Sequence, residues 1–536
     1  MPFAEAKHVP LKDIASEVQH DSPRERSVWE LAAILFDPLD LTVLTDLPTN
    51  GAEGFSDRIR KVILASFWEK ICQPTARDAA SAASNAEERA IAYLSANKIV
   101  DACDALTKGK DYRLAILMSQ LPSDRSMRED MANQLKQWRD LKALSEMTEP
   151  IRALYELMTG NACFCEGKKG PAEDIARHFV ISERFSLDWK RAFGLRLWYS
   201  ILPEDPLEIA VQRFETDLQS DQHQERKKPV PWFVEEKVPR DWQDPSPSSR
   251  EDLLWGLLKL YASSDAPPLA DIVGPLNATG NPLNARLSFQ LYHALALRFP
   301  QANNGKGDQL TWDLAIQLES SGEWLWALFA TLHLSNPEQR ERAVQSLLAH
   351  HVDAITDAEL QTLTTEFLIP TSWIWEAKAL LARSREDAVG EVQYLLRAEN
   401  WKEAHSVLCR TVGPRAIIEQ DYGTLQDLLQ GFEAAGRQQI EGWEEGGQVY
   451  LDFVDLVQEN LEDETEVLRE LLSALPAMAD SEMEFEQRVA VAEMSAVVGR
   501  KALQAEGKVC SDQVRPGVVW LTESRKFKRR RSLICP

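Results

Sequence analysis

Helical periodicity runs through almost the whole sequence and restricts the possible folds more than any other feature. Apolar residues recur three and four positions apart, so they gather on one face of a helix. No run of residues alternates apolar with polar side chains between Gly-rich turns, as a half-buried strand does. The connections between periodic segments are mostly short, which favours antiparallel neighbouring helices. The sequence therefore predicts an all-α fold.

The predicted helices fill most of the chain after residue 26. One apolar stripe comprises Phe55, Ile59, Val62, Ile63, Phe67 and Ile71, and a second comprises Ile99, Ala102, Cys103 and Leu106. Further helices are predicted near 124–141, 184–201, 250–262, 285–298, 309–319, 322–334, 338–350, 371–383, 389–397, 400–410, 422–435, 447–460 and 463–474. Residues 1–26 form an arm with one short predicted helix at 11–18.

A local pattern occurs at four places: an acidic residue or Asn, an aromatic residue, two variable residues and Ala. The four copies begin at Asp111, Asp188, Glu323 and Asn400. Asp, Glu and Asn suit a helix start, where free N–H groups and the helix dipole favour an acceptor. The aromatic residue and the Ala share a helix face, so the ring is expected to fill the groove between helices. The irregular spacing of the copies predicts a degenerate α-solenoid.

Charge and cysteine usage exclude several classes of function. The formal net charge is −24, a field that repels nucleic-acid phosphates, so no direct nucleic-acid binding is expected. The seven Cys are mostly isolated in apolar helical stretches, which predicts free thiols in a reducing compartment. No apolar run reaches the roughly 18 residues that a transmembrane helix needs, and no secretory signal is recognised.

Two short motifs partly match known binding sites, one for zinc and one for phosphate, but each lacks residues that such a site needs. Cys163-x-Cys165 lacks the second ligand pair that a structural zinc site needs. Gly167-Lys168-Lys169-Gly170 lacks the spacing and the following Ser or Thr of a phosphate-binding loop. The sequence holds no recognisable protease, esterase or dinucleotide motif. We therefore predict no catalytic, cofactor-binding or metal-binding residue, and no enzyme.

Partner contacts are predicted on aromatic residues and on one basic cluster. Helix faces rich in Leu and Trp within 100–220 are expected to bind a partner, with Trp198 and Tyr199 as candidates. Trp232 and Phe233 lie in the Pro-rich stretch 219–249, where they either pin that stretch onto the helices or contact a partner. The basic residues near the C-terminus fit a nuclear localisation signal, a contact for an acidic partner or a solvated tail. They are Lys526, Lys528, Arg529, Arg530 and Arg531.

Three stretches resemble one protein family. Trp29–Asp37, Gly160–Gly170 and Leu187–Tyr199 are similar to the C-terminal scaffold fragment of the self-cleaving nucleoporin precursor, known in fungi as the nucleoporin 145 C-terminal fragment. The resemblance covers roughly residues 27–410, and the last third matches in helical character only. It also accounts for the Cys-x-Cys loop without a metal.

The resemblance implies an ancestral coatomer element, an irregular α-solenoid that makes a U-turn and is divided into crown, trunk and tail. In the family, the crown pairs with the crown of another coat nucleoporin in the stem of the Y-shaped subcomplex of the nuclear pore. The tail meets the arm nucleoporins there. The family also lends strands to an open β-propeller shared with the COPII coat. Since residues 1–26 hold no three plausible strands, this chain is expected to lack that blade.

The function implied is a structural scaffold in the nucleus, at the nuclear pore in the nuclear envelope, which supports pore assembly and the transport of mRNA and protein. The alternatives are a vesicle-coat or other trafficking scaffold, and a helical-repeat enzyme or enzyme regulator. The expected segments are an arm (1–26), first trunk helices (27–99), a crown with the Pro-rich crossing at 219–249 (100–249), a trunk (250–399), a tail (400–525) and a basic end (526–536).

Overall fold

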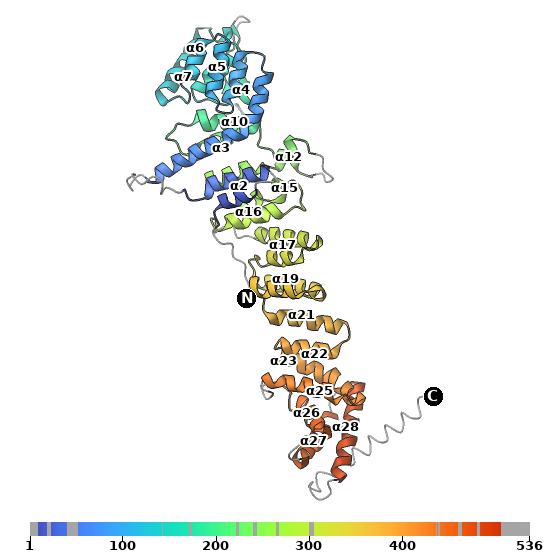
Figure 1. The fold of residues 1–536 in the computed structure, drawn as a ribbon. Helices are drawn as coiled ribbons and strands as arrows, with labels where there is room; N and C mark the ends of the chain where they lie inside the picture. Colours follow the sequence, from blue (N-terminus) through green and yellow to red (C-terminus); the bar gives the residue numbers. More distant parts are fainter. Residues whose placement is uncertain are drawn as a thin grey trace. The chain divides into compact units, whose positions relative to one another are not determined.

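The computed structural model describes most of the chain and divides it into two compact units. The described residues are 9–18, 23–39, 52–141, 143–170, 174–220, 225–238, 244–263, 267–299, 305–435, 437, 440–458, 464–479 and 483–504. We call Glu5–Ser320 the N-terminal unit, and Ser321–Pro536 together with Met1–Ala4 the C-terminal unit. The described residues are almost entirely helical, so the predicted all-α class is confirmed (Figure 1).

The N-terminal unit contains seventeen α-helices and a two-stranded sheet among its described residues. The helices of its first half are α1 (Leu11–Glu17), α2 (Pro23–Phe36), α3 (Ala52–Ala82), α4 (Ala86–Leu94), α5 (Ile99–Lys108), α6 (Tyr112–Met118), α7 (Arg125–Asp140), η3 (Ala143–Glu146) and α8 (Glu149–Met158). Then follow β1 (Phe164–Cys165), β2 (Phe179–Val180), α9 (Ile181–Arg184), α10 (Trp189–Leu195), the π-helical turn η5 (Arg196–Ser200), α11 (Leu207–Gln219), α12 (Trp232–Glu235), η6 (Pro247–Ser249), α13 (Leu253–Ala262), α14 (Leu269–Ile272), α15 (Pro275–Ala278), α16 (Arg286–Ala296) and α17 (Gly305–Ser320).

In the C-terminal unit the described elements are all helical. They are α18 (Trp324–Thr331), α19 (Pro337–His351), η8 (Val352–Ala354), α20 (Asp357–Gln361), η9 (Thr362–Glu366), α21 (Thr371–Ser384), α22 (Ala388–Arg397), α23 (Trp401–Val407), η10 (Leu408–Val412), α24 (Gly413–Glu419), α25 (Tyr422–Gln430), η11 (Gly431–Ala435), α26 (Gly447–Gln458), α27 (Glu464–Ala479) and α28 (Phe485–Gln504). Helices α19, α21 and α22 begin within one residue of their predicted starts.

The four-fold local pattern marks a helix start at every copy. Asp111, Asp188, Glu323 and Asn400 are the N-cap residues of α6, α10, α18 and α23. The side chains of Asp111, Asp188 and Asn400 accept the backbone N–H three residues on, whereas Glu323 makes no such bond. The Ala of each copy is buried. The four predicted helix starts are confirmed. They could be predicted because helix capping depends on neighbouring residues alone.

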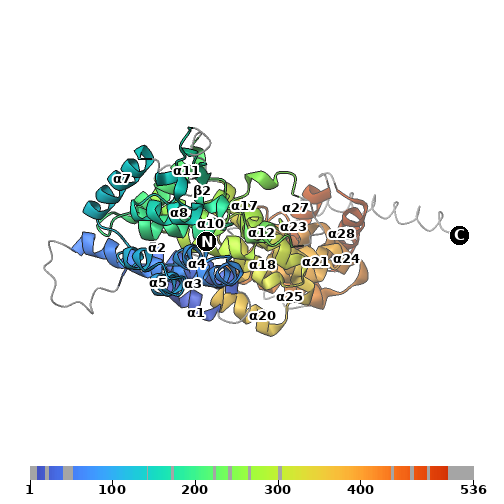
Figure 2. The same ribbon diagram turned by 90° about the horizontal axis from the view of Figure 1, so that it is seen from above.

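The chain of the N-terminal unit turns back along itself. Helix α2 packs on α13, and α3 packs on α10. Ion pairs join α2 to the region of α16: Arg298 pairs with Asp37 at 2.8 Å, and Arg286 pairs with Glu25 at 2.6 Å. Viewed from above, α1 to α5 lie along one side of this unit and α7, α8 and α11 along the other (Figure 2).

A cluster of large aromatic rings lies in the N-terminal unit where the outgoing helix α3 meets the returning helices α10 and α13. Trp68 of α3 lies 5.9 Å from Trp189 and 5.0 Å from Phe193, both of α10, measured between ring centroids. Phe193 in turn lies 5.7 Å from Trp255 of α13. The indole N–H of Trp68 donates to the carbonyl of Lys190 at 2.8 Å. Edge-to-face contacts of this kind add to the burial of the rings themselves.

The apolar stripe predicted on α3 is only partly a core face. The buried core residues of this helix include Leu64, Phe67, Trp68, Cys72 and Ala76. Val62 and Ile63, which the periodicity assigns to the stripe, are exposed, Val62 to 68%. The predicted stripe therefore departs from the core face at these two residues, because no helix of the described chain covers that side of α3 completely.

In the C-terminal unit, helices pack mainly on their neighbours in sequence. Helix α18 packs on α19, α21 on α22, α22 on α23, and α25 to α28 each on the next. The last helix, α28, returns to α24. The rings of Phe432, Tyr450 and Phe453 are fully buried in this unit's core.

The division between the two units, at Ser320 and Ser321, falls inside the predicted trunk of 250–399. The boundaries at 26, 99, 249, 399 and 525 separate the predicted arm, trunk, crown and tail segments. They rest on composition and on the family resemblance. They remain predictions.

Candidate partner surfaces

Trp198 and Tyr199, two predicted partner contacts, lie inside the N-terminal unit. Both belong to η5, and Tyr199 is 1% exposed. Its phenol donates to the carbonyl of Leu94 at the end of α4, at 3.2 Å, and burial raises the pKa of Tyr199 well above its ordinary value. The buried indole N–H of Trp198 has no hydrogen-bond partner among the described residues. The structure gives Tyr199 an internal role, and a partner contact at either ring remains a prediction.

Two arginines hold the carbonyl end of η5. Arg128 of α7 donates to the carbonyls of Tyr199, Ser200 and Ile201 at 2.8, 2.7 and 3.0 Å. Arg213 of α11 also donates to the carbonyl of Ser200. The last carbonyls of a helix lack intrahelical donors, and cationic side chains there satisfy them and the helix dipole. Helices α7 and α11 are thereby bonded to the same turn.

A buried ion network fixes the start of the Pro-rich stretch. Arg196 is 1% exposed and donates to Asp217 at 2.8 Å and to Glu225 at 3.0 Å. Glu225 is fully buried and also accepts the hydroxyl of Ser182. Burial alone would lower the pKa of Arg196, but Glu225 and Asp217 raise it above its ordinary value. Such a network persists only when every charge in it is paired.

Trp232 and Phe233 of α12 pin the Pro-rich stretch to the N-terminal unit. Phe233 is buried, and its ring lies 5.5 Å from that of Trp232. The guanidinium of Arg24, on α2, lies 3.9 Å from the ring centroid of Trp232 and pairs with Glu236. A guanidinium over an indole face is a favourable cation–π contact. Of the two interpretations left open, the internal one has these contacts behind it; a partner role for the two rings stays a prediction.

The Cys-x-Cys loop is a small structured element. Strand β1 pairs antiparallel with β2, with Phe164 opposite Val180 and Cys165 opposite Phe179. Arg152 of α8 donates to the carbonyls of Glu166, which follows β1, and Arg177, which precedes β2.

Both thiols of this loop are buried, which raises the pKa of Cys163 to about 12 and that of Cys165 well above its ordinary value. In the described chain no three His, Cys, Asp or Glu side chains gather where they could hold a metal ion. Lys168 of the Gly-Lys-Lys-Gly turn pairs with Asp174 at 2.8 Å, so the turn has a structural role.

Three exposed apolar side chains lie on the neighbouring helices α5 and α6, and the sequence analysis did not predict their exposure. Tyr112 and Ile116, one helical turn apart on α6, are 61% and 64% exposed, and Val100 of α5 is exposed as well. Leu114 and Met118 form the opposite, buried side of α6. Of the four copies of the aromatic pattern, the rings of Trp189 and Trp324 are buried and Trp401 is half-buried, so Tyr112 is the exception.

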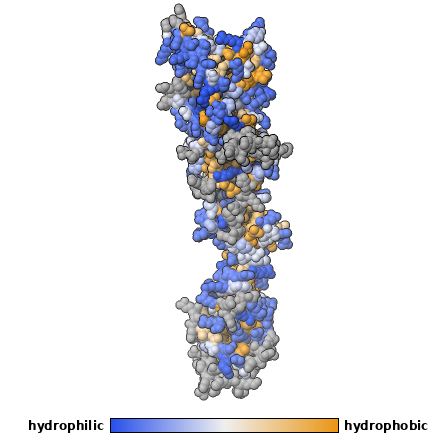
Figure 3. Space-filling model, turned by 90° about the vertical axis from the view of Figure 1, so that its left-hand side faces the viewer, coloured by the Kyte–Doolittle hydropathy of each residue, from blue (hydrophilic) through white to orange (hydrophobic). Residues whose placement is uncertain are grey.

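The expectation that Tyr112 fills a groove inside the fold is wrong, because no helix of the described chain packs over it. Helices α5 and α6 lie at the end of the N-terminal unit opposite α16 and α17 (Figure 1). The surface of that end carries apolar residues among hydrophilic ones (Figure 3). We call Val100, Tyr112 and Ile116 the apical face. The i, i+4 pair on the side of α6 away from Leu114 was the signal in the sequence that pointed to it.

The basic cluster formed by Lys526, Lys528, Arg529, Arg530 and Arg531 lies outside the described residues. Within them, no helix has both the length and the apolar character that crossing a membrane requires.

Comparison with known proteins gives a consistent result. The nuclear protein 96 family model matches residues 88–381, more than half of the 536-residue chain. Nucleoporin NUP145 of Chaetomium thermophilum is 32% identical over 458 residues, which are 84% of this chain and 22% of that protein. Nucleoporin nup189 of Schizosaccharomyces pombe is 31% identical over 468 residues, 83% of this chain and 24% of that protein. Nuclear pore complex protein Nup98-Nup96 of Drosophila melanogaster is 29% identical over 376 residues, 69% and 18% respectively.

The chain spans less than a quarter of the length of each of these relatives. The matched region runs from α4 into α21 and so includes the apical face and the Cys-x-Cys loop. On this evidence the chain belongs to the nuclear protein 96 family.

Proposed function

We propose that this chain is a non-enzymatic structural subunit of the nuclear pore complex at the nuclear envelope. The observation that carries the proposal is the likeness over most of the chain to proteins of three organisms that are named nucleoporins or nuclear pore complex proteins. Its mechanism is geometric: rigid stacks of helices hold partner surfaces at fixed positions. The buried rings of the N-terminal unit and the arginine bonds to η5 supply the rigidity such a support needs.

We further propose that the apical face binds another coat nucleoporin in the stem of a Y-shaped subcomplex. Exposed Tyr and Ile on one helix face are the kind of residues that form the centre of protein interfaces. The face lies within 100–249, the segment expected to be the crown. Contacts of the tail with arm nucleoporins, and any contact with the COPII-shared β-propeller, are further proposals that rest on the family resemblance alone.

The alternative of a vesicle-coat scaffold shares the helical build. What favours the pore is that the relatives compared above are named nucleoporins or nuclear pore complex proteins. A trafficking scaffold would meet membranes of the secretory pathway instead. The location of the protein in the cell therefore separates the two functions.

The test is fluorescence imaging of the tagged protein in its own cells, as wild type and as the Ile116→Asp variant. We expect a rim at the nuclear envelope for the wild type and a weaker rim for Ile116→Asp, because a buried carboxylate opposes association. Ile316→Asp is a matched control, since Ile316 on α17 is 61% exposed and lies outside the apical face.

A wild-type protein found on secretory membranes instead of the nuclear rim would overturn the pore function. Equal rim signals for the Ile116→Asp and Ile316→Asp variants would overturn the role of the apical face only.

A further inference from the structure

We propose that a groove between α1, α2 and α3 binds an acidic amphipathic helix of another protein. The groove lies in the N-terminal unit, on a different set of helices from the apical face, and has a volume of about 530 Å³. Volumes of about 300–1,000 Å³ are typical of ligand pockets. This proposal does not depend on the proposed pore function, because it rests on the groove alone.

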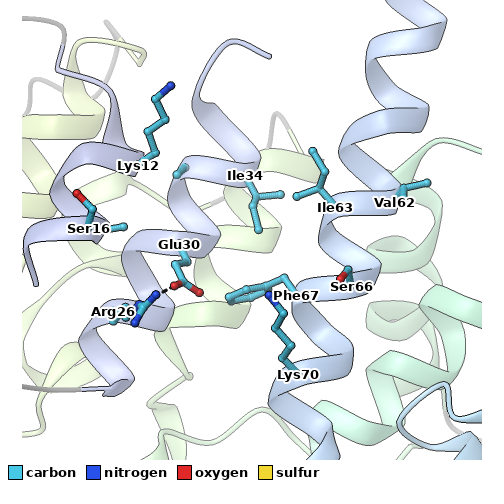
Figure 4. A pocket seen from close by; sticks show the side chains of 12 residues that line it. Lys12, Ser16, Arg26, Glu30, Ile34, Val62, Ile63, Ser66, Phe67 and Lys70 are labelled. Atoms are coloured by element: carbon cyan, nitrogen blue, oxygen red, sulfur yellow. Dashed lines mark hydrogen bonds and ion pairs between the residues drawn. The ribbon is translucent and has the colours of Figure 1, made fainter. Parts of the chain in front are cut away.

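The floor of the groove is apolar. Ile34 of α2 and Ile63 of α3 point toward one another across it, and Phe67 lies one turn further along α3 (Figure 4). Ala15 of α1 and Ala33 of α2 complete the floor without filling it. These small residues leave room for side chains of an occupant.

Part of the α3 stripe lines this groove instead of the core. Val62, at its edge, is 68% exposed, and Ile63 is also exposed. Large apolar side chains left in water at the edge of a concave surface are typical of binding sites. Covering them removes apolar surface from water, which favours binding.

The rim of the groove is basic. Lys12 stands on α1 and Lys70 on α3, on opposite walls. Neither ammonium group makes an ion pair with a described residue. The other two rim charges, Arg26 and Glu30, pair with each other at 2.7 Å. The groove thus presents two unpaired positive charges on a chain whose net charge is −24, and complementarity requires acidic residues on the occupant.

The geometry favours a helix as the occupant. Its side chains must point in three directions, down to the floor and out to each lysine. Side chains of a strand point in only two directions, whereas successive residues of a helix are turned by about 100°. A helix with apolar residues at i, i+4 and i+7 and acidic residues on both flanks meets all three needs.

The test measures binding of a labelled synthetic peptide to the full chain by fluorescence anisotropy. The peptide has about 15 residues, enough for a marginal helix, with leucines at helical spacing and glutamates on both flanks. A second peptide carries lysines in place of the glutamates. We expect the glutamate peptide to bind about tenfold more tightly than the lysine peptide.

Three variants sharpen the test. K12E/K70E should reverse the preference between the peptides, and Ile63→Asp should abolish binding of both. K108E/K136E is the matched control, because Lys108 and Lys136 are exposed on α5 and α7 and lie outside the groove. Circular dichroism checks that each variant remains folded.

Equal binding of the two peptides, no binding of either, or no effect of Ile63→Asp would each overturn the proposal. Binding that appears only after residues 41–50 are replaced by a Gly/Ser linker would also overturn it, since the occupant would then be the chain itself. Self-association of the wild type that Ile63→Asp removes, measured by light scattering, would point to a second copy and contradict it too.

Discussion

The N-terminal and C-terminal units are both stacks of α-helices, but they connect distant parts of the chain to very different degrees. In the N-terminal unit, Arg298 and Asp37 pair across 261 residues, and Trp68 donates to a carbonyl 122 residues away. In the C-terminal unit, the link from Gln487 to the carbonyl of Cys409 spans 78 residues, and most helices pack on the next in sequence.

A substitution should therefore act over a different range in each unit. A side chain that joins outgoing and returning helices supports several elements at once, so its loss should loosen all of them. A side chain that joins consecutive helices should affect one pair, as in repeat proteins whose units contact only their neighbours. The size of the loss of stability and the number of helices that loosen therefore distinguish the two units.

The largest effect is expected from Arg196→Met in the N-terminal unit. The substitution leaves the fully buried Glu225 and its neighbour Asp217 without their cation. Breaking a buried ion pair on one side costs about 3–5 kcal/mol of the free energy of unfolding. Hydrogen exchange should rise in η5, α11 and the start of the Pro-rich stretch together, and chemical denaturation should give the magnitude.

The matched control for this prediction is Arg415→Met in the C-terminal unit. Arg415 pairs with Glu419 one turn on at 3.8 Å, and both side chains are exposed. An exposed pair of this kind contributes about 0.5 kcal/mol or less. A loss of stability as large as that of Arg196→Met, or exchange that spreads beyond α24, would contradict the contrast between the units.

A smaller effect is expected from Tyr199→Phe. The substitution removes the bond from the phenol to the carbonyl of Leu94, and with it a link between η5 and α4. A hydrogen bond of this kind contributes about 0.5–1.5 kcal/mol to the free energy of unfolding. We expect that loss in denaturation, with faster exchange at the end of α4 and an unchanged affinity for pore partners. A weaker partner complex at unchanged stability would instead make Tyr199 a contact residue.

Buried titratable groups should make the stability of each unit depend on pH. In the C-terminal unit, His405 Nε2 accepts the N–H of Gly447 at 3.1 Å, and burial lowers the pKa of His405 below its ordinary 6.5. The folded state therefore binds this proton less readily than the unfolded state. The stabilisation is present above pH 6.5 and is lost as the pH falls below it.

Asp252 in the N-terminal unit has the opposite sign. Burial raises its pKa from 3.8 to about 6. The folded state thus holds this proton more tightly than the unfolded state. Its contribution is complete below pH 3.8 and is lost as the pH rises through about 6.

His405→Gln is the variant that isolates the histidine. Asp452, in the same unit, has a pKa raised by burial to about 6, so only the difference between wild type and variant is informative. Measured by denaturation between about pH 7.5 and 5.5, that difference should shrink as the pH falls. A difference that grows or stays constant would contradict the role of the buried imidazole.

The helix starts of this chain could be predicted from the sequence, whereas the burial of individual side chains could be predicted less well. The helix starts at Asp111, Asp188 and Asn400 follow from capping, which neighbouring residues decide. Whether a ring such as that of Tyr112 is buried depends on whether another helix packs against it. The periodicity of α6 does not predict which helix, if any, packs there.

The same limit explains three other features that the sequence did not predict. Val62 and Ile63 share a predicted stripe with core residues, yet the packing partners of α3 cover only part of that stripe. The groove on α1 to α3 could not be predicted, because its walls come from three separate helices whose packing the sequence does not state. The end of the predicted helix at 184–201 is the π-helical turn η5, whose carbonyls are held by Arg128, 71 to 73 residues earlier.

Light scattering after size exclusion, on the chain mixed with a coat nucleoporin of the pore's Y-shaped subcomplex stem, tests whether the apical face binds that partner. We predict a stable one-to-one complex for the wild type and the Ile316→Asp variant, and none for Ile116→Asp. A folded wild type that forms no complex, or an Ile116→Asp variant that binds as well as the wild type, would contradict the proposal that the apical face joins this chain to the pore scaffold.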